Sequence, residues 1–132
     1  MLFERKINYY ETDMMGIVHH SNYVRFLEEA RVQHLNEIGL PYKKMEDSGV
    51  LIPVLSTKCE YKYPARFDDI IVINLEMTEF NGVKMKLKYT ITNKENGNIV
   101  AVCETAHCFT DKNLKPLSLK KHFPEMYNLF FK

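Results

Sequence analysis

The sequence predicts a two-layer α+β domain in which an antiparallel sheet curls around one long helix. Two observations support this prediction. Apolar side chains with helical spacing occupy one stretch near the N-terminus, and four later segments are rich in Val, Ile, Thr, Tyr and Phe. Because a lone amphipathic helix and a large sheet must each bury an apolar face, we expect them to pack against each other.

Two different spacings of apolar residues predict the two N-terminal elements. Residues 3–9 alternate between apolar and polar side chains, the period of a half-buried strand, although Arg5 interrupts the apolar face. Apolar residues then recur at three- and four-residue steps and predict the long helix over residues 22–38. Ser21 or Asn22 is suited to cap the start of this helix, because a short polar side chain can accept a hydrogen bond from its first amides.

Gly39 and Pro41 are expected to end the long helix, since glycine suits the left-handed position and proline cannot continue the helix. A short helical turn is expected at 42–48. Four strands are predicted after it, over residues 50–63, 70–80, 83–92 and 99–110.

Turn signals connect the last three of these strands. Asn81-Gly82 is typical of a tight hairpin, and residues 95–98 make the next reversal, so we expect antiparallel neighbours arranged as a meander. Residues 116–132 are expected to form a tail with a short amphipathic turn.

Composition limits the class of protein. The 132 residues are enough for one domain with a real core, so a single domain over 1–132 is expected. Hydrophobic residues at 45% and charged residues at 27% exclude a disordered chain. The formal net charge of +1 offers no field for a nucleic acid partner. No apolar run approaches the roughly 18 residues of a membrane span, and no secretion signal is expected.

The three cysteines, Cys59, Cys103 and Cys108, are odd in number and form no C-x-x-C pair. This usage argues against a disulfide framework and favours a reducing compartment, so we expect a cytoplasmic protein. Strand alternation places Cys103 and His107 on one face and Cys108 on the other. We interpret Cys103 and Cys108 as buried structural thiols.

Chemically capable side chains concentrate in residues 11–23, which contain two acids, two histidines and a glycine. The segment ends at a helix N-terminus, where amides without intrahelical partners stabilise an anion. Gly16 can adopt a backbone conformation that is closed to other residues, and it can fold the loop so that the Asp13 carboxylate faces the amides near His20. A carboxylate and an oxyanion site would then converge.

Each of these residues also has a purely structural interpretation. An aspartate such as Asp13 most often bonds its own backbone in a turn, and His19 and His20 commonly pack at a helix start. Adjacent histidines suggest a metal, but no third ligand follows at a usual spacing. We therefore expect no metal site and no cofactor.

The chain resembles the 4-hydroxybenzoyl-CoA thioesterase group of the hotdog-fold superfamily, which includes thioesterases associated with the Tol-Pal cell-envelope system. The residues that carry the resemblance are Tyr10-x-Thr12-Asp13-x-x-Gly16-Ile17-Val18-x-His20-x-Asn22-Tyr23, with further matches in residues 26–31, 52–54, 61–69 and 107–117. The resemblance implies a hotdog fold, a long central helix wrapped by a curled antiparallel sheet. It also implies side-by-side subunits, as a homodimer or homotetramer, with active sites at their interface.

By this resemblance the catalytic carboxylate falls on Asp13 and the oxyanion-hole amide on the backbone N–H of His20. Asp13 could act as nucleophile or as general base, and the role of the His20 imidazole stays open. Other branches of the superfamily use a carboxylate on the helix, so Glu28 is kept as an alternative. The residues expected to contact or position substrate are Gly16, Ile17, Val18, Asn22, Tyr23, Lys84 and Lys86.

The predicted function is an acyl-CoA thioesterase that hydrolyses a thioester to a carboxylic acid and free coenzyme A. Acyl carrier protein could replace coenzyme A, and a non-catalytic thioester-binding hotdog module is a further alternative. The Thr12-Asp13-x-x-Gly16 pattern argues against hydration or dehydration of the acyl group. Lys84, Lys86 and Lys88 could steer the coenzyme A phosphates, although a solvated strand face is the commoner reason for such lysines.

Overall fold

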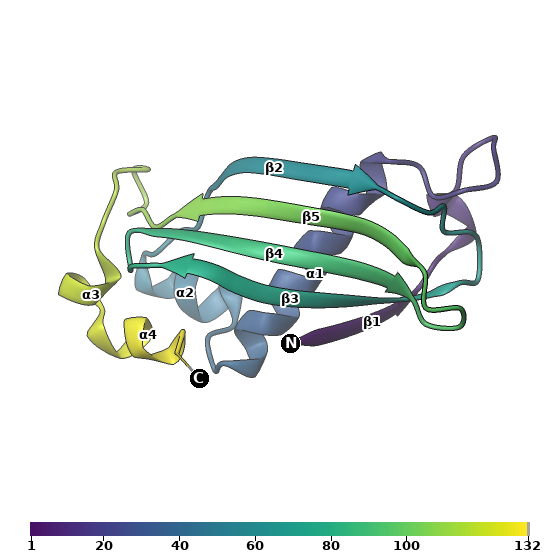
Figure 1. Ribbon diagram of the computed structural model, residues 1–132. Helices are drawn as coiled ribbons and strands as arrows, with labels where there is room; N and C mark the ends of the chain where they lie inside the picture. The colour runs from purple at the N-terminus through teal and green to yellow at the C-terminus, as the bar shows by residue number, and fades with distance from the viewer. Residues whose placement is uncertain (132) are drawn as a thin grey trace.

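The computed structural model describes residues 1–131 (Figure 1). Lys132, the last residue of the expected domain, lies outside the described residues. The elements in chain order are β1 (Leu2–Lys6), the 3-10 turn η1 (Tyr9–Glu11), α1 (Ser21–Glu37), α2 (Tyr42–Ser48), β2 (Val54–Tyr61), β3 (Ile70–Phe80), β4 (Lys84–Asn93), β5 (Ile99–Cys108), α3 (Leu119–His122) and α4 (Pro124–Leu129).

The strands form one five-stranded antiparallel sheet in the order β1-β3-β4-β5-β2. Figure 1 shows α1 crossing one face of this sheet, and the C-terminal helices lie at the opposite end of the sheet from the loop that precedes α1. The α+β fold class is confirmed. Both predicted hairpins, β3–β4 and β4–β5, are also confirmed.

The meander prediction is correct only for β3, β4 and β5. β2 does not pair with β3, its successor in sequence, but lies at the far edge beside β5, while β1 pairs with β3. Turn signals report pairing between strands joined by a tight reversal, whereas the long connection from Tyr61 to Ile70 carries the chain across the sheet. The predicted strand over 50–63 is also too long, because the segment before Val54 makes only an isolated bridge, between Leu51 and Thr110.

The long helix occurs where it was predicted, but its cap prediction is wrong. The helix begins at Ser21, and His20 occupies the capping position without a side-chain hydrogen bond. The Ser21 hydroxyl instead contacts His19 Nδ1 at 2.8 Å, and the Asn22 side chain donates to the backbone carbonyl of Glu11 at 2.8 Å. The side chains of both candidate caps therefore bind other groups, and the helix starts earlier than expected.

The predicted N-terminal strand is shorter than residues 3–9. It ends at Lys6, and the next residues form the turn η1, in which Tyr9 is 76% exposed rather than on a core face. This turn directs the chain from the edge of the sheet toward the start of α1.

The core lies between α1 and the sheet. Its fully buried side chains include Phe26, Leu27 and Ala30 from the helix. Facing them from the sheet are Ile71, Ile73, Leu87, Tyr89, Ile91 and Cys103. Burial of each large apolar side chain contributes about 1.5–3 kcal/mol, so this contact between layers is the main source of stability.

The C-terminal tail closes one end of this core. Phe130 is 3% exposed and stacks on Phe80 with ring centroids 4.7 Å apart, while Met126 is also buried. The expected amphipathic turn is therefore present within α4 and the residue that follows it.

The cysteines follow the predicted alternation in part. Cys103 and His107 are buried on the inner face of β5, whereas Cys108 and Cys59 are only half-buried. All three thiols are free. The predicted burial is thus correct for Cys103 and wrong for Cys108, which lies on the opposite strand face.

Candidate active site

The loop between η1 and α1 folds back on itself as a small hairpin. The Asp13 N–H donates to the Ile17 carbonyl at 2.8 Å, and the Gly16 N–H donates to the Asp13 carbonyl at 2.9 Å. Gly16 has a φ of +78°, in the left-handed region that favours glycine. The special backbone conformation expected of Gly16 is therefore present, and it produces the reversal.

The Asp13 side chain forms one hydrogen bond and otherwise faces a cavity. Its Oδ1 accepts from the Met15 N–H at 2.8 Å, while Oδ2 accepts no hydrogen bond from the described residues. The carboxylate is half-buried and lines a cavity of about 350 Å³. One carboxylate oxygen is thus held by the loop, and the other is available to a ligand.

The start of α1 carries an unpaired amide at a residue, His20, that lines the same cavity. The Asn22 N–H donates to the His19 carbonyl at 2.9 Å, and the Tyr23 N–H donates to the His20 carbonyl at 3.2 Å. The Ser21 N–H donates to His19 Nδ1 at 3.2 Å. Across residues 1–131, the His20 N–H has no acceptor. This donor lies at the positive end of the helix dipole, where an anion is stabilised.

The cavity is an open hollow bordered by the loop, the first turn of α1 and the end of β2. Its lining residues are Asp13, Met15, Ile17, Val18, His20, Tyr23, Tyr61, Lys62, Tyr63 and Pro64. The Tyr23 and Tyr61 rings pack with centroids 5.0 Å apart. Burial and the proximity of Tyr61 raise the pKa of Tyr23, so its hydroxyl stays protonated at neutral pH.

Sequence reasoning assigned no role to the four lining residues at the end of β2. The available signal was the Tyr61-x-x-Pro64 match within the family resemblance. Periodicity alone could not place this segment beside the loop, because β2 reaches the edge of the sheet through a long-range pairing with β5.

Several expected site residues lie elsewhere. Asn22 is buried and holds the Glu11 carbonyl. Lys84 and Lys86 project from the outer face of β4, and neither lines the cavity. Glu28 is exposed on α1 and lines a different cavity, of about 170 Å³. Within one protomer, the structure therefore brings together Asp13, Ile17, Val18, His20 and Tyr23 from the predicted set.

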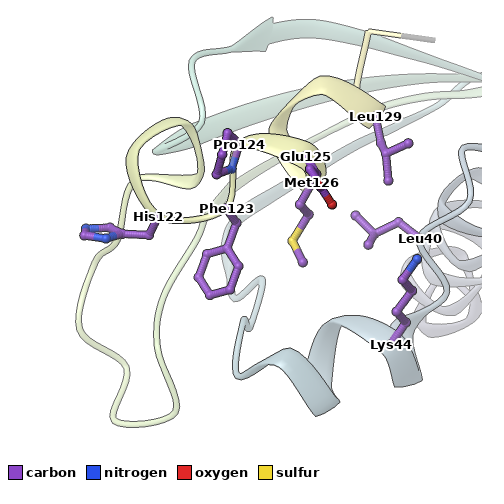
Figure 2. A pocket seen from close by; sticks show the side chains of 8 residues that line it. All are labelled: Leu40, Lys44, His122, Phe123, Pro124, Glu125, Met126 and Leu129. Carbon is purple, nitrogen blue, oxygen red and sulfur yellow. The ribbon is translucent and has the colours of Figure 1, made fainter.

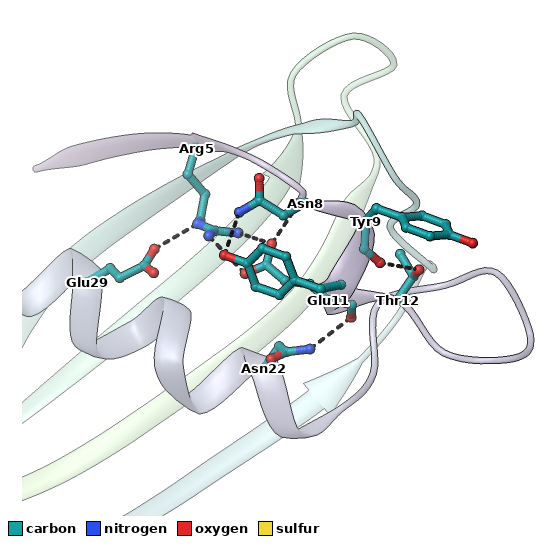
Figure 3. A network of polar contacts seen from close by, with 8 residues as sticks. Arg5, Asn8, Tyr9, Glu11, Thr12, Asn22 and Glu29 are labelled. Carbon is teal, nitrogen blue, oxygen red and sulfur yellow. Dashed lines mark hydrogen bonds and ion pairs between the residues drawn. The ribbon is translucent and has the colours of Figure 1, made fainter.

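A polar network fixes both ends of the loop (Figure 3). Arg5 lies between Glu29 of α1, 2.7 Å from its Nε, and Glu11, whose two carboxylate oxygens accept hydrogen bonds at 2.7 and 2.9 Å. The Glu11 backbone carbonyl also accepts from the His19 N–H at 2.9 Å and from the Asn22 side chain. Sequence reasoning missed this network, although the interruption of the strand's apolar face by Arg5 was a signal for it.

Figure 2 shows a second cavity, of about 400 Å³, between α2 and the C-terminal helices. Its ionisable side chains, Lys44, His122 and Glu125, are all exposed. Such groups are well solvated, and none of the catalytic candidates lies near them. The cavity at the start of α1 is therefore the better candidate for chemistry.

Residues 1–131 contain no group of three or more His, Cys, Asp or Glu side chains arranged to hold a metal ion. In the same part of the chain, no helix has both the length and the apolar character required to cross a membrane.

The layered fold and the loop at the start of α1 together define a hotdog-fold domain of the thioesterase type. A model of the Thioesterase-like superfamily matches residues 7–128. The chain belongs to this superfamily, and the predicted resemblance and hotdog fold are confirmed.

Individual relatives agree with this membership. The acyl-CoA thioester hydrolase YbgC of Escherichia coli is 30% identical over 116 residues, which cover 88% of this chain and 87% of the relative. The structure of a hypothetical protein from Aquifex aeolicus is 37% identical, with a TM-score of 0.88 over 96% of this chain and 98% of that one. The DHNA-CoA thioesterase of Staphylococcus aureus is 26% identical, with a TM-score of 0.92 over 98% of this chain and 87% of that one.

Proposed function

We propose that the protein is an acyl-CoA thioesterase that hydrolyses a thioester to a carboxylic acid and free coenzyme A. The observation that carries the proposal is that Asp13, with one carboxylate oxygen free of hydrogen bonds, and His20, with an unpaired amide at the helix start, line the same cavity. The names of the Escherichia coli and Staphylococcus aureus relatives support the same substrate class.

In the proposed mechanism the thioester carbonyl lies between these two groups. Charge grows on the carbonyl oxygen as it is attacked, and the His20 N–H donates a hydrogen bond to that oxygen. A preorganised donor of this kind contributes on the order of 10² to 10³ in rate. The amide acts without a proton transfer, so the mechanism requires nothing of the His20 imidazole.

Asp13 supplies the attack in one of two ways. As a general base it removes a proton from water, which adds to the carbonyl carbon, and such a base contributes on the order of 10² to 10⁴ in rate. As a nucleophile it forms a mixed anhydride and expels the coenzyme A thiolate, and water then hydrolyses the anhydride. The hydrogen bond from the Met15 N–H to Oδ1 supports either role, because it holds the carboxylate in one orientation.

Substrate contacts are proposed around this centre. An apolar part of the cavity wall, formed by Ile17, Val18 and Tyr23, suits the acyl group. Gly16 shapes the loop, and Asn22 shapes the helix start. Lys84 and Lys86 are proposed to attract the coenzyme A phosphates from the outer sheet face.

The assembly and the cell compartment are also part of the proposal. β2 is an edge strand with exposed Val54 and Leu55, and a second copy could cover this edge in a homodimer or homotetramer. The three free thiols suit a cytoplasmic protein.

The decisive experiment measures thiol release from a panel of aliphatic and aromatic acyl-CoA substrates and from acyl carrier protein thioesters. Asp13→Asn should lower turnover at least about a hundredfold, because it removes the base or nucleophile and keeps the shape. Asp47→Asn, on the exposed face of α2, is the matched control and should retain normal turnover.

Near-normal turnover of Asp13→Asn would remove Asp13 from the mechanism and bring Glu28 forward. Release of thiol from the carrier-linked substrates alone would identify an acyl carrier protein thioesterase. Binding of a thioester without release of thiol from any substrate would instead indicate a non-catalytic module.

A further inference from the structure

Two cysteines lie directly opposite each other on neighbouring strands. The β2–β5 register pairs Cys59 with Cys103, and opposite residues of an antiparallel pair project from the same face of the sheet. Cys103 is 2% exposed on the inner face, and Cys59 is half-buried beside it. Neither thiol has a role in the proposed thioesterase mechanism.

The hydrogen-bonding pattern places this pair at a site where side chains approach closely. The Lys62 N–H donates to the Val100 carbonyl at 2.8 Å, and these residues continue the β2–β5 register by one step. Hydrogen-bonded and non-hydrogen-bonded pairs alternate along an antiparallel ladder. Three steps from Lys62, the Cys59–Cys103 pair is therefore a non-hydrogen-bonded pair.

At a non-hydrogen-bonded pair the Cα atoms are about 4.5 Å apart, whereas disulfides span Cα separations of about 4.4–6.8 Å. A disulfide can therefore form here with little movement of the backbone. Because the separation is at the short end of the range, the bond would be strained, and a strained disulfide is readily reduced.

The two thiols are not equivalent. Hydrogen bonds from the Cys103 thiol and from Tyr61 lower the pKa of Cys59. The same contact with Cys59, together with burial, raises the pKa of Cys103. A thiolate is the reactive form of cysteine, so Cys59, which is also the more exposed of the two, is the better nucleophile. Cys103 is placed to react second.

We propose that Cys59 and Cys103 form a redox-active pair, which a hydroperoxide converts into a reversible cross-strand disulfide. The Cys59 sulfur attacks a peroxide oxygen and breaks the O–O bond, giving a sulfenic acid and releasing an alcohol, or water from hydrogen peroxide. The Cys103 sulfur then attacks the Cys59 sulfur, and the sulfenic oxygen leaves as water with the Cys103 proton. The two sulfurs together lose two electrons, which reduce the peroxide.

The surroundings of the pair connect it with the cavity at the start of α1. Tyr61, two residues after Cys59 on β2, lines that cavity and packs on Tyr23. The disulfide would tie β2 to β5 two residues before Tyr61. In a reducing compartment such a bond is transient and is reversed by a thiol reductant, as expected of a redox-sensing pair.

The test treats the reduced full-length protein with about one molar equivalent of hydrogen peroxide and then titrates thiols after denaturation. Two of the three thiols should be lost, and the mass should fall by two hydrogens within a monomer that remains monomeric on a non-reducing denaturing gel. Cys103 and Cys108 share one tryptic peptide, over residues 95–112, so the Cys108→Ser variant assigns the bond. This variant should form the same disulfide as the natural protein.

Two further variants separate the roles of the pair. Cys103→Ser should stop at a sulfenic acid on Cys59 that dimedone traps, whereas Cys59→Ser should keep both remaining thiols under the same treatment. Survival of all three thiols in the natural protein, a disulfide that includes Cys108, or a bond between two chains would overturn the proposal. Because no readout involves thioester hydrolysis, a failure here is distinct from a failure of the proposed function.

Discussion

Arg5 and Glu11 form a bidentate ion pair beneath the loop that carries Asp13. Two guanidinium nitrogens of Arg5 contact the two carboxylate oxygens of Glu11 at 2.7 and 2.9 Å, and the side chains are only 12% and 7% exposed. The Arg5 guanidinium also lies 4.2 Å above the centre of the Phe26 ring. Arg5 thus joins β1, η1 and α1 at the point where the candidate active-site loop begins.

Breaking this pair should destabilise the protein. Glu11→Gln leaves the buried Arg5 charge with Glu29 alone, and we expect the free energy of unfolding to fall by about 1–3 kcal/mol in urea denaturation. The matched control is Glu4→Gln, which breaks the exposed Glu4–Lys94 pair on the same strand. That change should stay within about 0.5 kcal/mol, because exposed ion pairs contribute little. Equal losses in the two variants would contradict the structural role of the buried pair.

The His20 amide can be removed separately from the His20 side chain. The φ of His20 is −56°, within the range of about −65 ± 15° that proline adopts, and the N–H that proline lacks has no acceptor among the described residues. We therefore expect His20→Pro to keep the fold and to lower thioesterase turnover on the order of 10² to 10³, as loss of an oxyanion donor does.

His20→Ala is the control for this prediction, since it keeps the amide and removes the exposed imidazole. It should retain most of the turnover measured by thiol release. A comparable loss in both variants would assign a role to the imidazole, and normal turnover in His20→Pro would exclude the amide as the oxyanion donor.

Local sequence patterns could predict part of this site and not the rest. Gly16 and Asp13 lie within one short loop, so a glycine turn and a short sequence motif were enough to predict that they belong to the site. The cap was mispredicted because Ser21 and Asn22 have short polar side chains that suit a cap, and only the folded chain shows their other partners.

The remaining features depend on contacts between distant segments. Arg5 meets Glu29 only when β1 packs against α1, and Tyr61 reaches the cavity only because β2 pairs with β5. The helix, the hairpins and the fold class were predictable because periodicity and turn residues act within a few positions. The edge placement of β2 has no local signal.

The loop reversal at Gly16 leads to a third prediction. Gly16→Ala places a Cβ 3.7 Å from the Arg66 guanidinium, an ordinary contact, so the expected cost of about 1–2 kcal/mol comes from the left-handed backbone. Gly97→Ala is a matched control, with a φ of +74° and no atom near the added Cβ. Both variants should lose similar stability in urea denaturation. Only Gly16→Ala should also lower turnover, because its loop orients Asp13; equal turnover in both would argue against that link.

Acid should destabilise the protein through His107. Burial, together with the positive charge of Arg31, lowers the pKa of His107 from 6.5 to about 4, and its Nε2 contacts Thr105 Oγ1 at 2.7 Å. Between these pH values the unfolded chain binds a proton that the folded chain excludes. The free energy of unfolding should therefore rise with pH from about 4 to 6.5, with a slope of up to about 1.4 kcal/mol per pH unit from this residue.

The slope can be measured by urea denaturation between about pH 5 and 6.5, a window set by the His107 shift. His107→Gln should reduce it, whatever its effect on absolute stability, because the titrating group is gone. The exposed His122→Gln variant should keep the slope of the natural protein. Part of the slope should persist in both variants, since burial also lowers the pKa of His34. An unchanged slope in His107→Gln would show that its imidazole does not resist protonation in the folded state.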